Sequence, residues 1–236
     1  MKKITVILIC VFASFGVQGQ NIIGAWERYF TSEKGEKLKT IITFSNAYKV
    51  TTTYNTLNGE FINTTGGSWK LEGNSVIEKI EFNTDNPELV GEKLNSKISI
   101  SDTVLKIVDE DIQFTKIDNG LPGALQGSWL MSGRIRNGET ESRDTSRPRK
   151  TMKILSGTRF QWIAYNTETK QFMATGGGTY TTINGKYTEN IEFFSRDVTR
   201  VGASLEFDYS LKDGNWHHSG LSSKGTPIYE IWSLRK

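Results

Sequence analysis

Most of the sequence consists of two similar copies of one segment. Residues 39–91 align with residues 150–202 at a constant offset of 111 and without a gap, and 16 of the 53 positions are identical. The identities include Tyr54-Asn55-Thr56 with Tyr165-Asn166-Thr167, Phe61 with Phe172, Gly66-Gly67 with Gly177-Gly178, and Ile80-Glu81-Phe82 with Ile191-Glu192-Phe193. A repeat of about 100 residues is too long for a solenoid unit and has the size of a small domain. The chain is therefore predicted to contain two copies of one fold.

A Gly-x-Trp motif precedes each copy, at Gly24-Ala25-Trp26 and at Gly127-Ser128-Trp129. The offset between these motifs is 103, so the second copy is eight residues longer, and the extra residues are predicted to form a longer loop between Arg134 and Lys150. The segment 119–123 carries the Gly, Asn and Pro residues of a linker. The predicted division is a first domain over 20–118, a linker over 119–123 and a second domain over 124–236.

The N-terminal residues 1–19 have the pattern of a signal peptide. Lys2 and Lys3 precede a short apolar core, and Val17-Gln18-Gly19 supplies a small-residue cleavage site. The apolar run is too short to predict a membrane span in the mature protein. We therefore expect export to the periplasm or the extracellular space. Cys10 lies in the removed segment, so the mature protein would contain no cysteine and no disulfide.

The charge balance argues against polyanionic partners. Removal of Lys2 and Lys3 takes the formal charge from +3 to +1, and the basic cluster from Arg143 to Lys150 is interrupted by Asp144. A nearly neutral chain gives no electrostatic basis for binding nucleic acid or an anionic membrane. The pattern predicts no particular oligomeric state.

The mature sequence is typical of an all-β protein. Runs rich in Thr, Ile, Val, Phe and Tyr are separated by turns that carry Gly, Asn and Asp. The segment 203–211 alternates strictly between apolar and polar residues, as in a strand with one buried face. Asn184-Gly185 and Asp213-Gly214 are tight-turn pairs suited to antiparallel hairpins. Each copy is long enough for eight strands, and closure of the sheet into a barrel would remove its exposed edges.

The opening Gly-x-Trp followed by an antiparallel meander resembles the lipocalin and calycin barrels. The second copy, with Gly176-Gly177-Gly178 and Tyr229-Glu230-Ile231-Trp232, is also similar to uncharacterised lipocalin-like secreted proteins of Gram-negative bacteria. The resemblance implies two tandem antiparallel lipocalin-like β-barrels, with Trp26 and Trp129 closing one end of each. Both copies are shorter than ordinary lipocalins, so the resemblance bears on the fold more than on the ligand.

Metal, phosphate and triad chemistry find little support. The two histidines, His217 and His218, are neighbours and would point to opposite faces of a strand, so they cannot hold one metal ion together. Ser219 and Ser222 lie near them without the context of a nucleophile elbow. Gly176-Gly177-Gly178 lacks the lysine and helix of a phosphate loop and predicts a bulged strand instead. We expect no metal, no cofactor and no catalytic triad.

Two repeated carboxylates are the most informative polar residues. Glu78 and Glu189 each share a strand face with Ile and Phe, whereas Glu81 and Glu192 point to the opposite face. If the apolar face is inside, Glu189 is an interior carboxylate and requires a partner or a shifted pKa. Two interpretations stay open for Glu189: an ion pair or hydrogen bond within the barrel, or orientation of a bound ligand.

The second copy is the better candidate for a ligand site because large aromatic rings replace smaller residues there. Trp162 and Tyr187 stand where the first copy has Thr51 and Val76. The predicted site has apolar walls and polar anchors, as ligand pockets commonly do. Its walls are Trp162, Tyr187 and Tyr209, and its anchors are Glu189 and His218.

Three functions are compatible with this pattern. The favoured hypothesis is a non-enzymatic binding protein for a small, partly apolar or amphipathic molecule. The first alternative is a surface-interaction module, with solid barrels that bind a protein or glycan through outer faces or loops. The second alternative is an enzyme that uses Glu189 and His218 as an acid–base pair.

Overall fold

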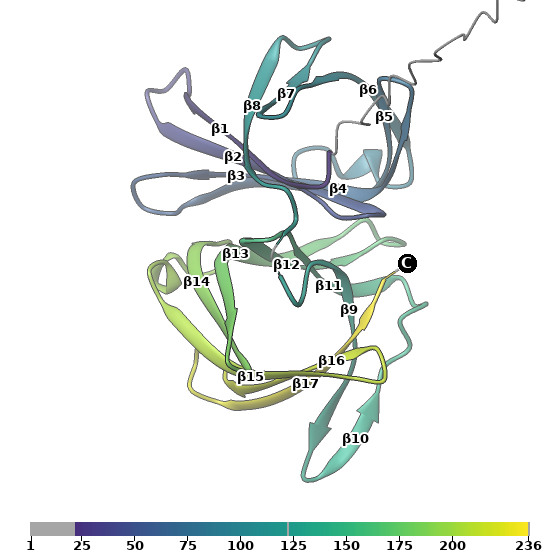
Figure 1. The fold of residues 1–236 in the computed structure, drawn as a ribbon, viewed down its shortest axis with the longest axis vertical. Helices are drawn as coiled ribbons and strands as arrows, with labels where there is room; N and C mark the ends of the chain where they lie inside the picture. Colours follow the sequence, from purple (N-terminus) through teal and green to yellow (C-terminus); the bar gives the residue numbers. More distant parts are fainter. Residues whose placement is uncertain (1–21, 122, 236) are drawn as a thin grey trace, which may run out of the picture.

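A computed structural model describes residues 22–121 and 123–235, and the predicted signal peptide lies outside these ranges. The described chain is almost entirely β-structure, and its only helical elements are two single 3₁₀ turns. It forms two antiparallel barrels stacked one on the other, as Figure 1 shows. The predicted all-β class and the tandem barrels are therefore confirmed.

The first barrel is a closed eight-stranded meander in which each strand pairs with its neighbours in sequence and β8 returns to β1. Its strands are β1 (Gly24–Thr31), β2 (Lys37–Phe44), β3 (Tyr48–Asn55), β4 (Phe61–Glu72), β5 (Ser75–Asn83), β6 (Lys93–Ile100), β7 (Val104–Ile107) and β8 (Ile112–Asp118). The 3₁₀ turn η1 (Pro87–Leu89) connects β5 to β6.

The second barrel repeats this meander and adds one strand. It closes through pairing of β9 with β17, while β10 pairs only with the outer end of β9. Its elements are β9 (Gly127–Arg136), β10 (Glu139–Ser142), β11 (Arg149–Leu155), β12 (Arg159–Asn166), β13 (Phe172–Ile183), β14 (Lys186–Phe194), η2 (Val198–Arg200), β15 (Ser204–Lys212), β16 (Asn215–Leu221) and β17 (Pro227–Leu234). The inserted residues were predicted as a loop, but they extend β9 and form a β9–β10 hairpin that projects from the barrel in Figure 1.

Two kinds of glycine shape these strands. Asn184 and Gly185 adopt φ of 52° and 77°, the left-handed conformation that a two-residue hairpin turn requires. Gly178 lies where the β13–β14 register shifts, and a Cβ there would come within 1.9 Å of a backbone oxygen of Asn190. Gly67 holds the matching position in β4, with the same register shift and the same 1.9 Å approach to Lys79. The bulge predicted from the glycine run is thus confirmed, and it explains why both copies keep the glycines.

Each barrel has its own interior core, anchored by the Gly-x-Trp tryptophan. Trp26 and Trp129 are buried, and their indole N–H groups donate to the carbonyl oxygens of Ile22 and Leu125, both at 2.9 Å. The same anchor therefore holds the entering chain against each barrel. The predicted burial of the two tryptophans is confirmed.

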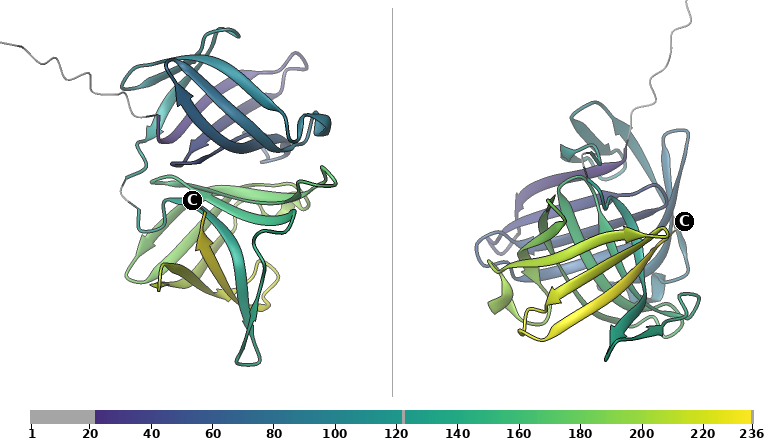
Figure 2. Two further views of the ribbon diagram at one scale, coloured as in Figure 1. Left: turned by 90° about the vertical axis from the view of Figure 1, so that its right-hand side faces the viewer. Right: turned by 60° about the horizontal axis from the view of Figure 1, so that its bottom comes forward.

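A third core lies between the barrels, where a sheet face formed by β2–β5 packs against a sheet face formed by β11–β14. Figure 1 shows β2, β3 and β4 facing β11, β12 and β13, and Figure 2 shows the same stacking of the barrels from a second side. The contact is built from pseudo-symmetric pairs. Tyr54 donates to Glu192 and Tyr165 donates to Glu81, while the Tyr54 ring lies 4.8 Å from Phe193 and the Tyr165 ring 4.8 Å from Phe82.

The two equivalent phenylalanines Phe61 and Phe172 stack on each other at 5.8 Å, near the centre of this pseudo-two-fold relation. An ion pair reinforces each of the two Tyr–Glu contacts. Arg159 pairs with Glu192 at 2.6 Å, and Arg235 pairs with Glu81 at 2.7 Å. The outward-facing glutamates of the repeat therefore serve the inter-barrel contact. Many of the repeated identities belong to this contact and do not face either barrel interior.

Candidate functional site

A pocket of about 320 Å³ opens into the second barrel. Its lining comes from β9, β11, β12 and the strands β14 to β17, together with η2 and the loop after β16. The lining residues are Met131, Thr151, Lys153, Trp162, Glu189, Ile191, Phe194, Arg200, Leu205, Phe207, His218, Ser222, Ser223, Ile228, Glu230 and Trp232. Apolar side chains thus surround a small set of charged and polar groups, the combination typical of ligand sites.

An ion pair lies at the base of this pocket. The Nζ atom of Lys153 is 2.8 Å from Oε1 of Glu189, and each side chain keeps only 6 % of its surface exposed. The Tyr187 hydroxyl donates to the same oxygen at 2.9 Å. Rings of Tyr187, Trp216 and Trp232 lie about 5 Å from the ammonium, so cation–π attraction adds to the pair. Burial and the charge of Glu189 raise the pKa of Tyr187 well above its ordinary value, which keeps this hydroxyl a donor.

A second polar group lies beside the first. Nδ1 of His218 is 3.2 Å from Oε2 of Glu230, which also accepts a hydrogen bond from the Trp232 indole at 3.2 Å. Burial, together with the nearby charge of Lys153, lowers the pKa of His218, so the ring is neutral at neutral pH. Burial alone would raise the pKa of Glu230, but the His218 hydrogen bond and the Lys153 charge hold it below the ordinary value. Glu230 is therefore a carboxylate.

These protonation states fix the direction of the hydrogen bond. A carboxylate can only accept, so Nδ1 of His218 carries the proton and donates it to Glu230. The other ring nitrogen, Nε2, is then an acceptor, and it is buried without a hydrogen-bond partner among the described residues. An unpaired buried polar atom costs free energy.

The walls of the pocket are aromatic and aliphatic. Trp162 and Phe194 pack edge to face with ring centres 5.4 Å apart, and Phe207 packs against His218 at 4.1 Å. Arg200 reaches the lining from η2, where Asp197 holds its Nε atom at 3.0 Å. The guanidinium charge at this wall is therefore already compensated.

The structure brings three of the five predicted site residues to the pocket surface: Trp162, Glu189 and His218. Tyr187 was predicted as a wall, but it is fully buried beneath Glu189 and does not line the pocket. Tyr209 was also predicted as a wall, yet it packs at the edge of the core cluster and lies outside the lining. Tyr187 supports the pocket from beneath through its hydrogen bond to Glu189.

Two residues at the centre of the pocket, Lys153 and Glu230, were not predicted as site residues. Lys153 faces inward at the position where the first barrel has Ile42, and Glu230 shares a strand face with Trp232. A lysine at the repeat position of a core isoleucine was a usable signal, and so was a glutamate two residues before a tryptophan in an apolar strand. Glu189 is hydrogen-bonded to Lys153 and His218 to Glu230, so the two residues suggested as an acid–base pair each have another partner.

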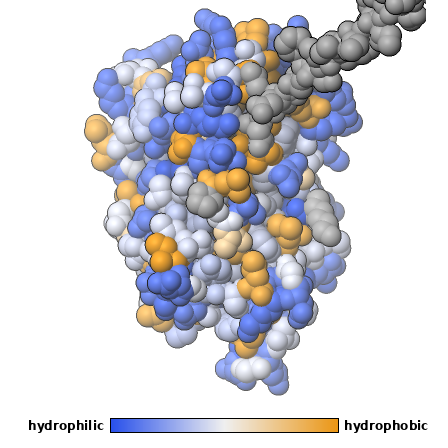
Figure 3. Space-filling view, viewed as in Figure 1, coloured by the Kyte–Doolittle hydropathy of each residue, from blue (hydrophilic) through white to orange (hydrophobic). Residues whose placement is uncertain are grey.

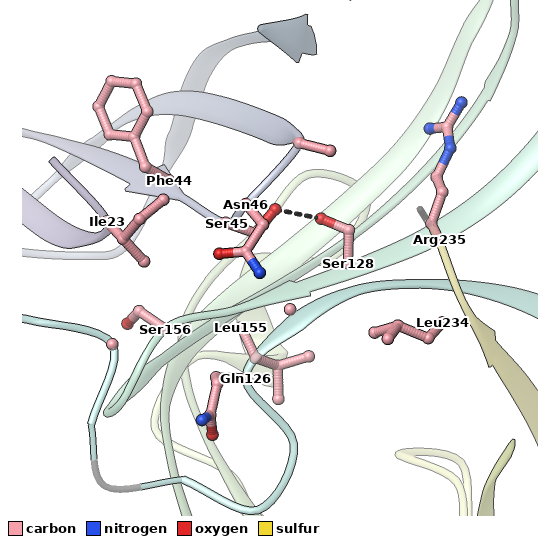
Figure 4. A pocket seen from close by; sticks show the side chains of 13 residues that line it. Ile23, Phe44, Ser45, Asn46, Gln126, Ser128, Leu155, Ser156, Leu234 and Arg235 are labelled. Carbon is pink, nitrogen blue, oxygen red and sulfur yellow. Dashed lines mark hydrogen bonds between the residues drawn. The ribbon is translucent and has the colours of Figure 1, made fainter. Parts of the chain in front are cut away.

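A second cavity, of about 350 Å³, lies between the barrels and is shown in Figure 4. The Ser45 and Ser128 hydroxyls meet across it at 2.8 Å, and Arg235 at its border is committed to Glu81. None of the buried unpartnered polar atoms of the described chain belongs to its lining. This cavity therefore offers a ligand less than the pocket of the second barrel does.

The described ranges contain neither a cluster of metal-ligand side chains nor a membrane-spanning helix. No cluster of three or more His, Cys, Asp or Glu side chains there could hold a metal ion. No helix among the same residues is long and apolar enough to cross a membrane.

Comparison with known proteins bears on the second barrel alone. No curated protein matches the chain. Residues 124–234, which comprise the barrel that contains the pocket, match the family model described as a domain of unknown function, DUF4488.

Proposed function

We propose that the protein binds a small, partly apolar molecule in the pocket of the second barrel. The observation that carries this proposal is the unpartnered Nε2 atom of His218, buried in a pocket whose other walls are largely apolar. Unpartnered buried atoms also occur at Glu78, Arg159 and Trp216, but of these four residues His218 is the one that lines the pocket. With the signal peptide predicted from residues 1–19, the binding would take place outside the cytoplasm.

The surface offers less support for a protein-binding or glycan-binding module. Large exposed apolar side chains occur on both barrels, among them Tyr29, Leu57, Ile183 and Leu221. On the face shown in Figure 3, apolar residues are dispersed among hydrophilic ones and form no broad patch. Scattered apolar residues of this kind are ordinary for a protein surface.

The proposal is tested by blocking the pocket. Leu205 lines it, and Leu94 holds the matching position opposite the repeated glutamate in the first barrel. Titration calorimetry with the neutral amphipathic probe phenylbutanol should show binding to the unaltered chain. Leu205→Trp should weaken it by at least about tenfold, because the new indole occupies the pocket volume.

Leu94→Trp is the matched control and should leave the affinity for phenylbutanol unchanged. Circular dichroism and thermal unfolding of both variants establish that the barrels remain folded. Equal loss in both variants, or no binding to the unaltered chain, contradicts the proposed function.

A further inference from the structure

In the part of the chain that the structure describes, the two carboxylates of the pocket each accept side-chain hydrogen bonds on one oxygen only. Both hydrogen bonds to Glu189 end on Oε1, and both hydrogen bonds to Glu230 end on Oε2. The second oxygen of each carboxylate accepts no side-chain hydrogen bond among the described residues, and Nε2 of His218 is also without a donor. One oxygen of each carboxylate is therefore an acceptor to which a donating ligand can bind.

The cation of the pocket is not available to an anionic ligand. Nζ of Lys153 is bonded to Glu189, enclosed by three rings and almost fully buried. Arg200 is held by Asp197 and by a backbone oxygen of Ser223. A carboxylate or phosphate would thus have to displace Glu189 from Lys153, or share the Arg200 guanidinium with Asp197.

The lining carries two cations, Lys153 and Arg200, and two carboxylates, Glu189 and Glu230, but Glu230 has no cationic partner of its own among the described residues. Lys153 and Glu189 cancel, and Arg200 and Asp197 cancel, which leaves the carboxylate of Glu230 beside a neutral His218. The Glu230 side chain keeps 21 % of its surface exposed, so its charge is open to the pocket. Coulomb attraction to an incoming cation is stronger in such a partly buried site than in water.

The walls also suit a cation. Trp162, Phe194, Phe207 and Trp232 line the space next to these acceptors. Aromatic faces attract ammonium groups, and the strength increases when the cation is desolvated. Resting on the proposed function, we propose that the pocket selects amphipathic amines, with the ammonium directed to Glu230 and His218 and the apolar part against the aromatic walls.

The test ranks three probes that share one apolar part and differ only at the head group. These are phenylbutylamine, phenylbutanol and phenylbutyrate, titrated calorimetrically against the full chain at neutral pH. The amine should bind at least about tenfold more tightly than the alcohol, and the carboxylate should bind most weakly. This ranking uses the unaltered chain, so it does not depend on whether a variant folds.

Glu230→Gln tests the origin of the preference. It removes the charge and keeps an oxygen for Trp232 and His218, so the amine should lose about tenfold in affinity while the alcohol changes by less than about twofold. Glu78→Gln removes an interior carboxylate of the first barrel, the repeat counterpart of Glu189, and should change neither affinity.

The outcomes separate the two proposals. If phenylbutanol binds and is blocked by Leu205→Trp, but the amine shows no advantage or phenylbutyrate binds as tightly, the amine inference is wrong and the binding function stands. An amine preference that survives Glu230→Gln also overturns the inference. If none of the three probes binds, both proposals fail.

Discussion

The two barrels share a backbone plan and differ in how they use their interiors. Both place a glutamate at the same repeat position, Glu78 in β5 and Glu189 in β14, and both pair it with a lysine. The lysines come from different strands: Lys49 from β3 and Lys153 from β11. The repeat thus conserves an interior ion pair without conserving the residue that completes it. An interior carboxylate constrains its surroundings to supply a cation, and several strands can do so.

The apolar residues around the pairs differ as well. Val76 and Asn83 of the first barrel correspond to Tyr187 and Phe194 of the second. The first core is mostly aliphatic, whereas the second is rich in rings that surround Lys153 and border the pocket. A common frame with divergent interiors is the arrangement expected when one copy carries the binding site and the other supports it.

The largest expected effect tests the shared frame. Trp26→Ala and Trp129→Ala each remove a buried anchor and should lower the free energy of unfolding by about 3–5 kcal/mol. Urea denaturation of the two variants measures the cost. A value near zero for either tryptophan would contradict the equivalence of the two anchors.

The next effect tests the interior ion pairs. Lys153→Met leaves Glu189 buried without its cation and should cost about 3 kcal/mol. Lys49→Met is the matched variant and should cost less, because Lys49 keeps 14 % of its side-chain surface exposed against 6 % for Lys153. Equal costs would show that the two pairs are equally sealed from water, which would remove this difference between the barrels.

A smaller effect tests the pseudo-symmetric contact. Tyr54→Phe and Tyr165→Phe each delete one hydroxyl that donates to a carboxylate of the other barrel, and each should cost about 1.5–3 kcal/mol. Because the two halves of the contact are equivalent, the losses should be similar in thermal unfolding. A loss confined to one tyrosine would show that the contact is not symmetric in energy.

A further effect is a pH dependence from the same contact. Burial alone would raise the pKa of Glu192, but hydrogen bonds from Arg159 and the charge of Arg159 lower it from 4.5 to about 2. A depressed folded-state pKa contributes stability that is fully present above pH 4.5 and is lost as the pH falls toward 2. Glu192→Gln should therefore flatten the acid side of the stability profile between these values. An unchanged acid slope would contradict the assigned role of Glu192.

Much of the fold followed from the sequence because the repeat and the strand periodicity are local patterns. Three features could be predicted from the sequence: the bulge glycines, the hairpin turn at Asn184-Gly185 and the buried Gly-x-Trp anchors. The β9–β10 hairpin could not be predicted, because its strand Glu139–Ser142 is fully exposed and carries no apolar alternation. The hydrogen bond between Tyr54 and Glu192 could not be predicted either, because a residue repeated in both copies can lie inside each barrel or in the contact between the barrels.

The candidate site was only partly predictable for a similar reason. Period-two alternation places Glu189 inside, but it does not say that Lys153 from another strand will reach it. Nor does alternation separate a ring that lines a space, such as Trp162, from one packed beneath it, such as Tyr187. Those distinctions depend on the strand register around the closed barrel, which only the three-dimensional arrangement provides.

The most direct test of a binding site confined to the second barrel uses the six tryptophans as reporters. Two-dimensional NMR resolves one indole N–H signal for each, and single Trp→Phe variants assign them. Trp162 and Trp232 line the pocket, whereas Trp26 and Trp69 belong to the first barrel. Titration with phenylbutanol should shift the signals of Trp162 and Trp232 and leave those of Trp26 and Trp69 in place. Shifts confined to Trp26 and Trp69, or no shift at any tryptophan, would contradict the account.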